Sequence, residues 1–173
     1  MQLIGCTKKL QKEMGLGGKD LSTFEPDNSG LGPWTANLIF VNRRKCILFV
    51  NDKTMFNFLV PDMLRKYIRE LDRMFLGWLS CTLAEEGYVN SQREEILNEY
   101  QQIGYSNTRS RSVLGSMNEL AFIYKFSIQA ISGLHDHRFP EIIKEMNRIP
   151  MGSLGYQLPI EALFEINPPR TSE

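Results

Sequence analysis

The 173-residue sequence lacks an excess of either charge, and this absence narrows its possible partners. Lys plus Arg and Asp plus Glu each total 20, so the formal net charge is zero. Proteins that bind nucleic acid without specificity usually carry a clear basic excess, so any site for a polyanion must be a local patch. No run of about 18 apolar residues occurs either, so neither a transmembrane helix nor a membrane partner is expected.

Cysteine and histidine are also scarce. The three cysteines, Cys6, Cys46 and Cys81, lie far apart and are odd in number, which favours a reducing cytoplasm over a disulfide framework. His135 and His137 have a spacing that can chelate zinc, but a structural zinc site needs about four ligands and no cysteine lies nearby. We therefore expect a polar turn at 135–137, with no metal site and no cofactor.

Two apolar runs rich in β-forming residues predict a hairpin over residues 34–50. They flank a four-residue polar tip, 42–45, in which three residues are cationic. Because side chains alternate along a strand, we expect one face of the hairpin to enter the core and the cations to be exposed. The expected core residues are Leu38, Phe40, Ile47 and Phe49, and the exposed ones are Arg43, Arg44 and Lys45. Residues 54–60 fit either a third strand or a short helix.

The pattern becomes helical after Pro61. Apolar residues at three- and four-residue spacing predict one long helix from about 62 to 83. Arg65, Arg69 and Arg73 stack along one flank of it, which could grip a phosphate backbone or an acidic partner, but the neighbouring acids favour a solvated, salt-bridged face. A capping box at Ser91 predicts a second helix, a third covers about 112–132, and Pro140 opens a short fourth.

The order of these elements predicts one α+β domain over residues 1–173. Residues 1–60 are mainly strand and loop, 61–148 mainly helical, and 149–173 a C-terminal strap. We expect a small N-terminal antiparallel sheet, the hairpin plus one or two further strands, packed against a C-terminal bundle of three to four helices. The Gly-rich segment 15–18 follows a helix and lacks P-loop spacing, so we interpret it as a helix stop.

The third predicted helix carries the second basic candidate. Arg111, Asn118, Lys125 and Gln129 fall on one narrow stripe, and apolar residues including Phe122 flank it, so we expect the helix to be mostly buried. Such a stripe would lie in a cleft, in a hydrogen-bond network or in plain solvent. Arg109 and Arg111 adjoin the helix start, where anions are attracted, although the same segment also explains capping by Ser110 or Ser112.

We therefore predict one anionic ligand that is shared by the hairpin tip and the start of the third helix. Arginine offers bidentate contacts to phosphate, so Arg43, Arg44, Arg109 and Arg111 would be direct contacts. The complete set of ligand-binding candidates is Arg43, Arg44, Lys45, Arg109, Arg111, Asn118 and Lys125.

Five separated motifs resemble a known family. They are Cys6-Thr7-Lys8-Lys9-Leu10, Trp34-x-Ala36-Asn37-Leu38 with Asn42-Arg43-Arg44-Lys45-Cys46, Asn51-x-x-Thr54, Ser110-Arg111-Ser112-Val113-Leu114-Gly115-Ser116-Met117-Asn118, and Asn147-Arg148-Ile149-Pro150-Met151. Together they resemble a family of uncharacterised, mostly bacterial proteins that is classed only as a domain of unknown function. The resemblance spans nearly the whole chain and implies a single cytoplasmic domain. It implies no activity, substrate or catalytic residue.

Three functions remain open. The first is a binding or regulatory module for a nucleic acid, a nucleotide or an acidic protein. The second is a phosphoryl-transfer or nuclease-type enzyme, but Glu94, Glu95, Glu99 and Glu119 show no metal-ligand pattern. The third is a structural or homo-oligomeric component of a bacterial regulatory or defence pair. With no recognisable nucleophile, metal set or cofactor loop, the sequence favours binding over catalysis, and we assign no catalytic residue.

Overall fold

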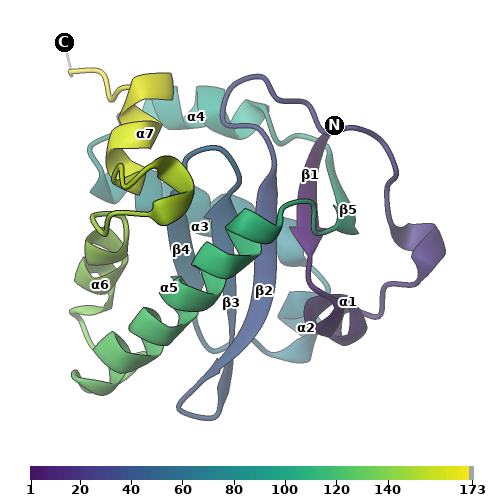
Figure 1. Cartoon of the computed structure of the whole chain (residues 1–173), viewed down its shortest axis with the longest axis horizontal. Helices are drawn as coiled ribbons and strands as arrows, with labels where there is room; N and C mark the ends of the chain where they lie inside the picture. The colour runs from purple at the N-terminus through teal and green to yellow at the C-terminus, as the bar shows by residue number, and fades with distance from the viewer. Residues whose placement is uncertain (172–173) are drawn as a thin grey trace.

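A computed structural model of the chain describes residues 1–171, and it is built on one mixed sheet of five strands (Figure 1). The strands lie in the order β4-β3-β2-β1-β5. Their bounds are β1 Gln2–Cys6, β2 Trp34–Val41, β3 Arg44–Asn51, β4 Asn57–Val60 and β5 Ile103–Asn107. The prediction of an α+β fold is confirmed, and β4 settles the open choice at 54–60 as a strand.

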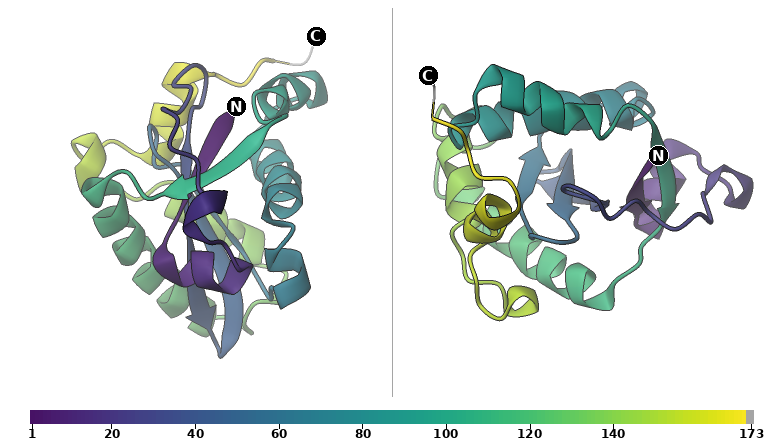
Figure 2. Two further views of the ribbon diagram at one scale, coloured as in Figure 1. Left: turned by 90° about the vertical axis from the view of Figure 1, so that its right-hand side faces the viewer. Right: turned by 90° about the horizontal axis from the view of Figure 1, so that it is seen from above.

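Helices cover both faces of the sheet. The α-helices are α1 Lys8–Met14, α2 Arg65–Ile68, α3 Leu71–Glu85, α4 Asn90–Asn98, α5 Arg111–Gln129, α6 Phe139–Met146 and α7 Pro159–Ile166. Seen from above, α3 and α4 lie on one face and α5 on the other (Figure 2). No helix within residues 1–171 is both long and apolar enough to cross a membrane.

The sheet is mixed rather than antiparallel as predicted, because its first strand has parallel neighbours on both sides. β1 pairs parallel with β2 and with β5, whereas β2–β3 and β3–β4 are antiparallel. The sequence prediction contained no β5. Its five residues, Ile-Gly-Tyr-Ser-Asn, are mostly half-buried and include only one β-branched residue, so no alternating pattern marks them. The β1–β5 register places Asn107 beside Cys6.

The hairpin turns more tightly than predicted. Val41 pairs with Arg44, so only Asn42 and Arg43 form the loop, with φ of 49° and 65°. Two consecutive positive φ values are those of a type I′ turn, whose twist matches that of the flanking strands. Arg43 and Arg44 are exposed as predicted, whereas Lys45 is only half-buried beside Glu13.

The predicted core face of the hairpin is confirmed at three of its four positions. Leu38, Ile47 and Phe49 are buried, but Phe40 is 42% exposed, so its assignment to the core is wrong. Phe40 pairs with Lys45 two residues from the turn, and this end of the hairpin extends past the helices that cover the rest of the sheet (Figure 1).

Two helix predictions also need correction. The long helix from 62 to 83 is interrupted between α2 and α3, so Arg65 and Arg73 belong to different helices. The capping box at Ser91 does not form, because α4 begins at Asn90 after Val89, which makes no side-chain cap. The side-chain amide of Asn90 instead donates a hydrogen bond to the Glu94 carboxylate at 2.9 Å.

The third predicted helix, α5, is an outer-layer helix, so the expectation that it is mostly buried is wrong. Phe122 and Phe126 on its outer side are 73% and 68% exposed. Ser110 does cap it, accepting a hydrogen bond from the Val113 amide at 3.2 Å. The predicted C-terminal strap contains a 3-10 turn, Gly152–Leu154, followed by α7.

An aromatic cluster fills the core between the sheet and α3. Trp34, Phe49, Phe58, Phe75 and Tyr100 have neighbouring ring centroids 5.2–6.1 Å apart. The buried indole N–H of Trp34 donates to the Tyr100 hydroxyl at 2.8 Å, and that hydroxyl lies 2.8 Å from the Gly32 carbonyl. The largest core side chain is therefore fixed by both packing and hydrogen bonding.

Candidate functional site

A concentration of positive charge lies where the hairpin tip, α1 and α2 meet, toward the lower end of the molecule in Figure 1. We call residues 8–14, 42–45 and 62–69 the basic end. They contain nine Lys and Arg residues against two acids, Glu13 and Asp62, which gives a formal charge of +7. Because the whole chain is neutral, the remainder carries −7. The molecule is therefore strongly polarised, and the patch expected from the sequence is larger than the hairpin alone.

The two acids of the basic end hold its three segments together. Glu13 on α1 hydrogen-bonds to Lys45 of β3 and lies 3.6 Å from the Arg65 guanidinium of α2. The hydrogen bond from Lys45 lowers the pKa of the Glu13 carboxyl below its ordinary value, with a further contribution from the nearby positive charges. Asp62 similarly lies 3.3 Å from the exposed Arg44. These acids engage only part of the positive charge.

Exposed aromatic rings lie within the basic end and beside it. Phe40 is 42% and Tyr67 is 40% exposed. The ammonium of Lys9 lies 4.8 Å from the Phe40 ring centre, and that of Lys66 lies 4.8 Å from the Tyr67 ring centre. Each ring therefore presents a flat apolar surface accompanied by a cation, a combination suited to stacked bases and phosphates.

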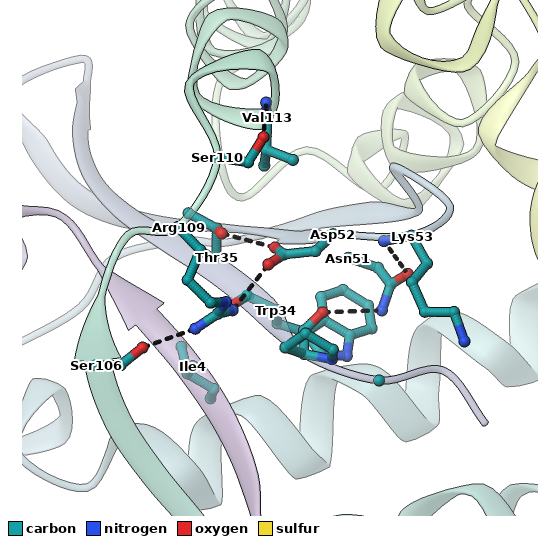
Figure 3. A network of polar contacts seen from close by, with 12 residues as sticks. Ile4, Trp34, Thr35, Asn51, Asp52, Lys53, Ser106, Arg109, Ser110 and Val113 are labelled. Atoms are coloured by element: carbon teal, nitrogen blue, oxygen red, sulfur yellow. Dashed lines mark hydrogen bonds and ion pairs between the residues drawn. The ribbon is translucent and has the colours of Figure 1, made fainter. Parts of the chain in front are cut away.

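Arg109, a predicted ligand contact, instead joins the strands on the α5 side of the sheet (Figure 3). Its guanidinium donates to the Ser106 hydroxyl at 2.7 Å, the Trp34 carbonyl at 3.0 Å and the Asp52 carboxylate at 2.8 Å. Asp52 in turn accepts from the Thr35 hydroxyl at 2.7 Å. With three acceptors already engaged, Arg109 has a structural role.

The close approach of Arg109 to β1 leaves little room for a side chain there. A Cβ added to Gly5 would lie 3.3 Å from the Arg109 guanidinium and 3.2 Å from the Asn107 carbonyl oxygen. The sequence could not reveal this bridge, because Asp52 and Arg109 are 57 residues apart and meet only when β5 joins the sheet.

The two basic elements that the sequence assigned to one shared ligand lie at opposite ends of α5. A Cβ on Gly133, just beyond the C-terminal end of α5, would lie 3.4 Å from the Asn42 side chain, so the hairpin tip lies beside that end. Arg111 occupies the first turn of α5. A helix of 19 residues is about 28 Å long, so one small ligand cannot contact both Arg43 and Arg111.

The remaining candidates lie outside the basic end. Asn118 and Gln129 are exposed and Lys125 is half-buried on the outer side of α5, which favours plain solvation among the three alternatives for this stripe. Arg65 and Arg73 form ion pairs with Glu13 and Glu70, as expected for a salt-bridged flank.

Two interpretations of polar segments are confirmed. Gly15 ends α1 with a left-handed φ of 75°, as a helix stop should. Residues 135–137 form a polar turn between α5 and α6, where His135 lies 3.3 Å from Asp62. Within residues 1–171, no cluster of three or more His, Cys, Asp or Glu side chains has a metal-binding arrangement.

A comparison with family models places the chain in a family. The model of a domain of unknown function, DUF6933, matches residues 3–162. The chain belongs to this family. The resemblance inferred from the five motifs, to a domain of unknown function, is thereby confirmed. No curated protein and no solved structure matches the chain.

Proposed function

We propose that this protein is a binding module whose basic end holds a single-stranded nucleic acid. The observation that supports the proposal is the combination of a local charge of +7 with two exposed aromatic rings, Phe40 and Tyr67, each beside a lysine. Proteins that bind single strands combine cations along the backbone with aromatic rings on which bases stack. Neither feature alone distinguishes a nucleic acid from an acidic protein, whereas the two together favour the nucleic acid.

The charge distribution suits this function despite the neutral chain. A polarised molecule orients its basic end toward a polyanion as the two approach, and the acidic remainder limits binding elsewhere on the surface. Exposed Arg43 at the turn, which has no hydrogen bond or ion pair within residues 1–171, is free to contact phosphate.

The test compares two triple variants with equal net charge. Lys9→Gln/Arg43→Gln/Lys66→Gln removes three cations from the basic end, and Lys19→Gln/Lys125→Gln/Lys144→Gln removes three elsewhere. We expect the first to weaken binding of a labelled single-stranded oligonucleotide by at least about tenfold, because each lost phosphate contact reduces counterion release. The control variant should bind like wild type. Equal weakening by both variants would contradict a site at the basic end.

The aromatic rings need a separate pair of variants. Base stacking contributes about 1–3 kcal/mol per base, so Phe40→Ala and Tyr67→Ala should each weaken oligonucleotide binding about fivefold or more. Phe122→Ala, which removes a ring that is 73% exposed on α5, is the matched control and should have no effect. Heparin is a polyanion without bases, so the affinity of the protein for heparin should not change in any of these three aromatic variants. If the aromatic variants bind the oligonucleotide normally while the charge variant does not, an acidic protein becomes the better candidate partner.

A further inference from the structure

A small cavity lies in the groove between α3 and α6, and we call it the α3–α6 cavity. The two helices run side by side in the same direction, because Trp78 packs against Phe139 at the start of α6 and Glu86 bonds to Arg148 just past its end. The cavity between them has a volume of about 120 Å³. None of the residues that line it belongs to the basic end, so it is separate from the proposed nucleic-acid site.

The walls of the cavity are mostly apolar and include two aromatic rings. Trp78, Cys81 and Thr82 come from α3, and Phe139 and Ile143 come from α6. The Trp78 and Phe139 ring centres are 6.3 Å apart, and the two rings are nearly perpendicular, at 82°. The Thr82 hydroxyl donates to the Trp78 carbonyl at 2.7 Å, so its polar group is already satisfied. A third ring placed here can stack on one wall and meet the other edge-on, the arrangements that aromatic pairs prefer.

The size of the cavity suits one small ring. An engineered cavity of about 150 Å³ with apolar walls stays dry and binds benzene. The α3–α6 cavity is slightly smaller, but Cys81 and Pro140, which line it, are exposed, so it opens to solvent. A second hollow that shares Trp78 and Cys81 adjoins it along α3 at Gly77, where an added Cβ would meet no atom within 4 Å. A bound ring therefore has room to extend beyond the cavity itself.

The cavity also has polar residues toward one end. Glu85 and Lys144 line it next to the ion pair between Glu86 and Arg148, and Arg148 donates to the Lys144 carbonyl at 2.9 Å. Within residues 1–171, the Glu85 carboxylate and the Lys144 ammonium have no hydrogen bond or ion pair of their own. A carboxylate only accepts and an ammonium only donates, whereas a hydroxyl does both. We propose that the α3–α6 cavity binds one small aromatic molecule that carries a hydroxyl, a simple phenol.

The two tryptophans of the chain provide a reporter and an internal control. Only Trp34 and Trp78 are present, so an NMR spectrum of the isotope-labelled full chain contains two indole N–H signals. Titration with phenol should shift the Trp78 signal along a saturable curve. The Trp34 signal should stay in place, because Trp34 is fully buried and its N–H donates to Tyr100.

Two analogues of phenol separate the contributions of the ring and the hydroxyl. Cyclohexanol keeps the hydroxyl but has no aromatic ring, and toluene keeps the aromatic ring but has no hydroxyl. Each should bind at least about fivefold more weakly than phenol, because each lacks one of the two interactions that the cavity offers. Equal binding of phenol and either analogue would overturn the assignment of the ligand.

Two substitutions of Cys81 test the location of the bound ring. Cys81→Phe and Cys81→Ala both remove the thiol, which makes no hydrogen bond within residues 1–171, but only phenylalanine places a ring in the cavity. Cys81→Phe should lower the phenol affinity at least about tenfold, whereas Cys81→Ala should stay within about twofold of wild type, because only the first leaves no room for a second ring. Thermal midpoints close to that of wild type would show that both variants fold.

The Cys81 thiol of the wild type gives an independent reading, because it is exposed while the other two cysteines are buried. Phenol should slow the alkylation of Cys81 by iodoacetamide in the native protein in proportion to the bound fraction, and it should have no such effect in urea. An unshifted Trp78 signal, equal phenol affinity in Cys81→Phe and Cys81→Ala, or an unchanged alkylation rate at saturating phenol would overturn the proposal. Each of these results is independent of oligonucleotide binding at the basic end, so this proposal and the proposed function can fail separately.

Discussion

Replacing Asn147 should destabilise the fold strongly, because one buried side chain completes the edge of the sheet. Asn147 is fully buried between α6 and β4, and β4 is the last strand of the sheet. Its Oδ1 accepts from the Asn57 amide at 2.8 Å, and its Nδ2 donates to the Asn57 carbonyl at 2.8 Å. The side chain therefore bonds to both backbone groups of Asn57, as a neighbouring strand would.

The expected cost follows from the groups left without partners in Asn147→Leu. Leucine has the same branched shape and is somewhat larger, so no cavity forms, but the Asn57 N–H and C=O both lose their partner in a buried position. One N–H of the Asn57 side-chain amide also loses its acceptor, Asn147 Oδ1 at 3.1 Å. An unsatisfied buried polar group costs about 1–3 kcal/mol, so the two together should cost about 2–6 kcal/mol. Ile143, the other acceptor of Asn147 Nδ2, keeps the backbone hydrogen bond from the Asn147 amide at 3.3 Å.

Urea unfolding of wild type and variant gives this difference directly, provided both have the same dependence on urea. Asn98→Leu, an exposed asparagine on α4, is the control and should change stability by less than about 0.5 kcal/mol. Tyr124→Phe removes only the hydroxyl that donates to Asn57 Oδ1 at 2.7 Å and should fall between the two. A value for Asn147→Leu within about 1 kcal/mol of wild type would refute the reasoning from unsatisfied groups.

Two further predictions concern titratable groups. Cys6 and Cys46 are buried and Cys81 is exposed, and burial raises the pKa of the Cys6 thiol to about 12. A thiol reagent should therefore label one cysteine in the native protein and three in urea. Rapid labelling of two or more cysteines in the native state would contradict the packing of β1 and β3. Burial raises the pKa of Glu99, whose carboxylate accepts from the Leu31 amide at 3.0 Å. Because the folded-state pKa lies above the unfolded value, ionisation of this carboxyl lowers the stability of the fold as pH rises through that interval. Glu99→Gln should therefore gain stability relative to wild type on going from pH 4 to pH 7. A relative loss of stability over the same range would contradict the prediction.

The fold class and the hairpin could be predicted because their signals are local. Two β-rich runs around a polar turn specify a hairpin without reference to the rest of the chain. The helix starts at Ser110 and Pro140 are likewise set by a capping hydroxyl and a proline. Phe40 was misplaced because alternation states which face a residue occupies but not where the covering helices end.

The sites could be predicted only in part, since they depend on contacts between distant segments. The sequence predicted the cations of the hairpin tip. It did not predict that the tip lies beside α1 and α2, because that contact depends on Glu13, which pairs with Lys45 and Arg65. The bridge made by Arg109 could not be predicted for the same reason, as its partner Asp52 is brought near only by the complete sheet.

The salt dependence of oligonucleotide binding tests the central claim, a polyanion site at the basic end, most directly. For single strands the logarithm of the affinity falls with the logarithm of the salt concentration with a slope of roughly −0.7 per phosphate neutralised. The account predicts that Lys9→Gln/Arg43→Gln/Lys66→Gln makes this slope shallower by about 2, which corresponds to three lost phosphate contacts, while Lys19→Gln/Lys125→Gln/Lys144→Gln leaves it unchanged. The same slope for wild type and both variants would contradict it.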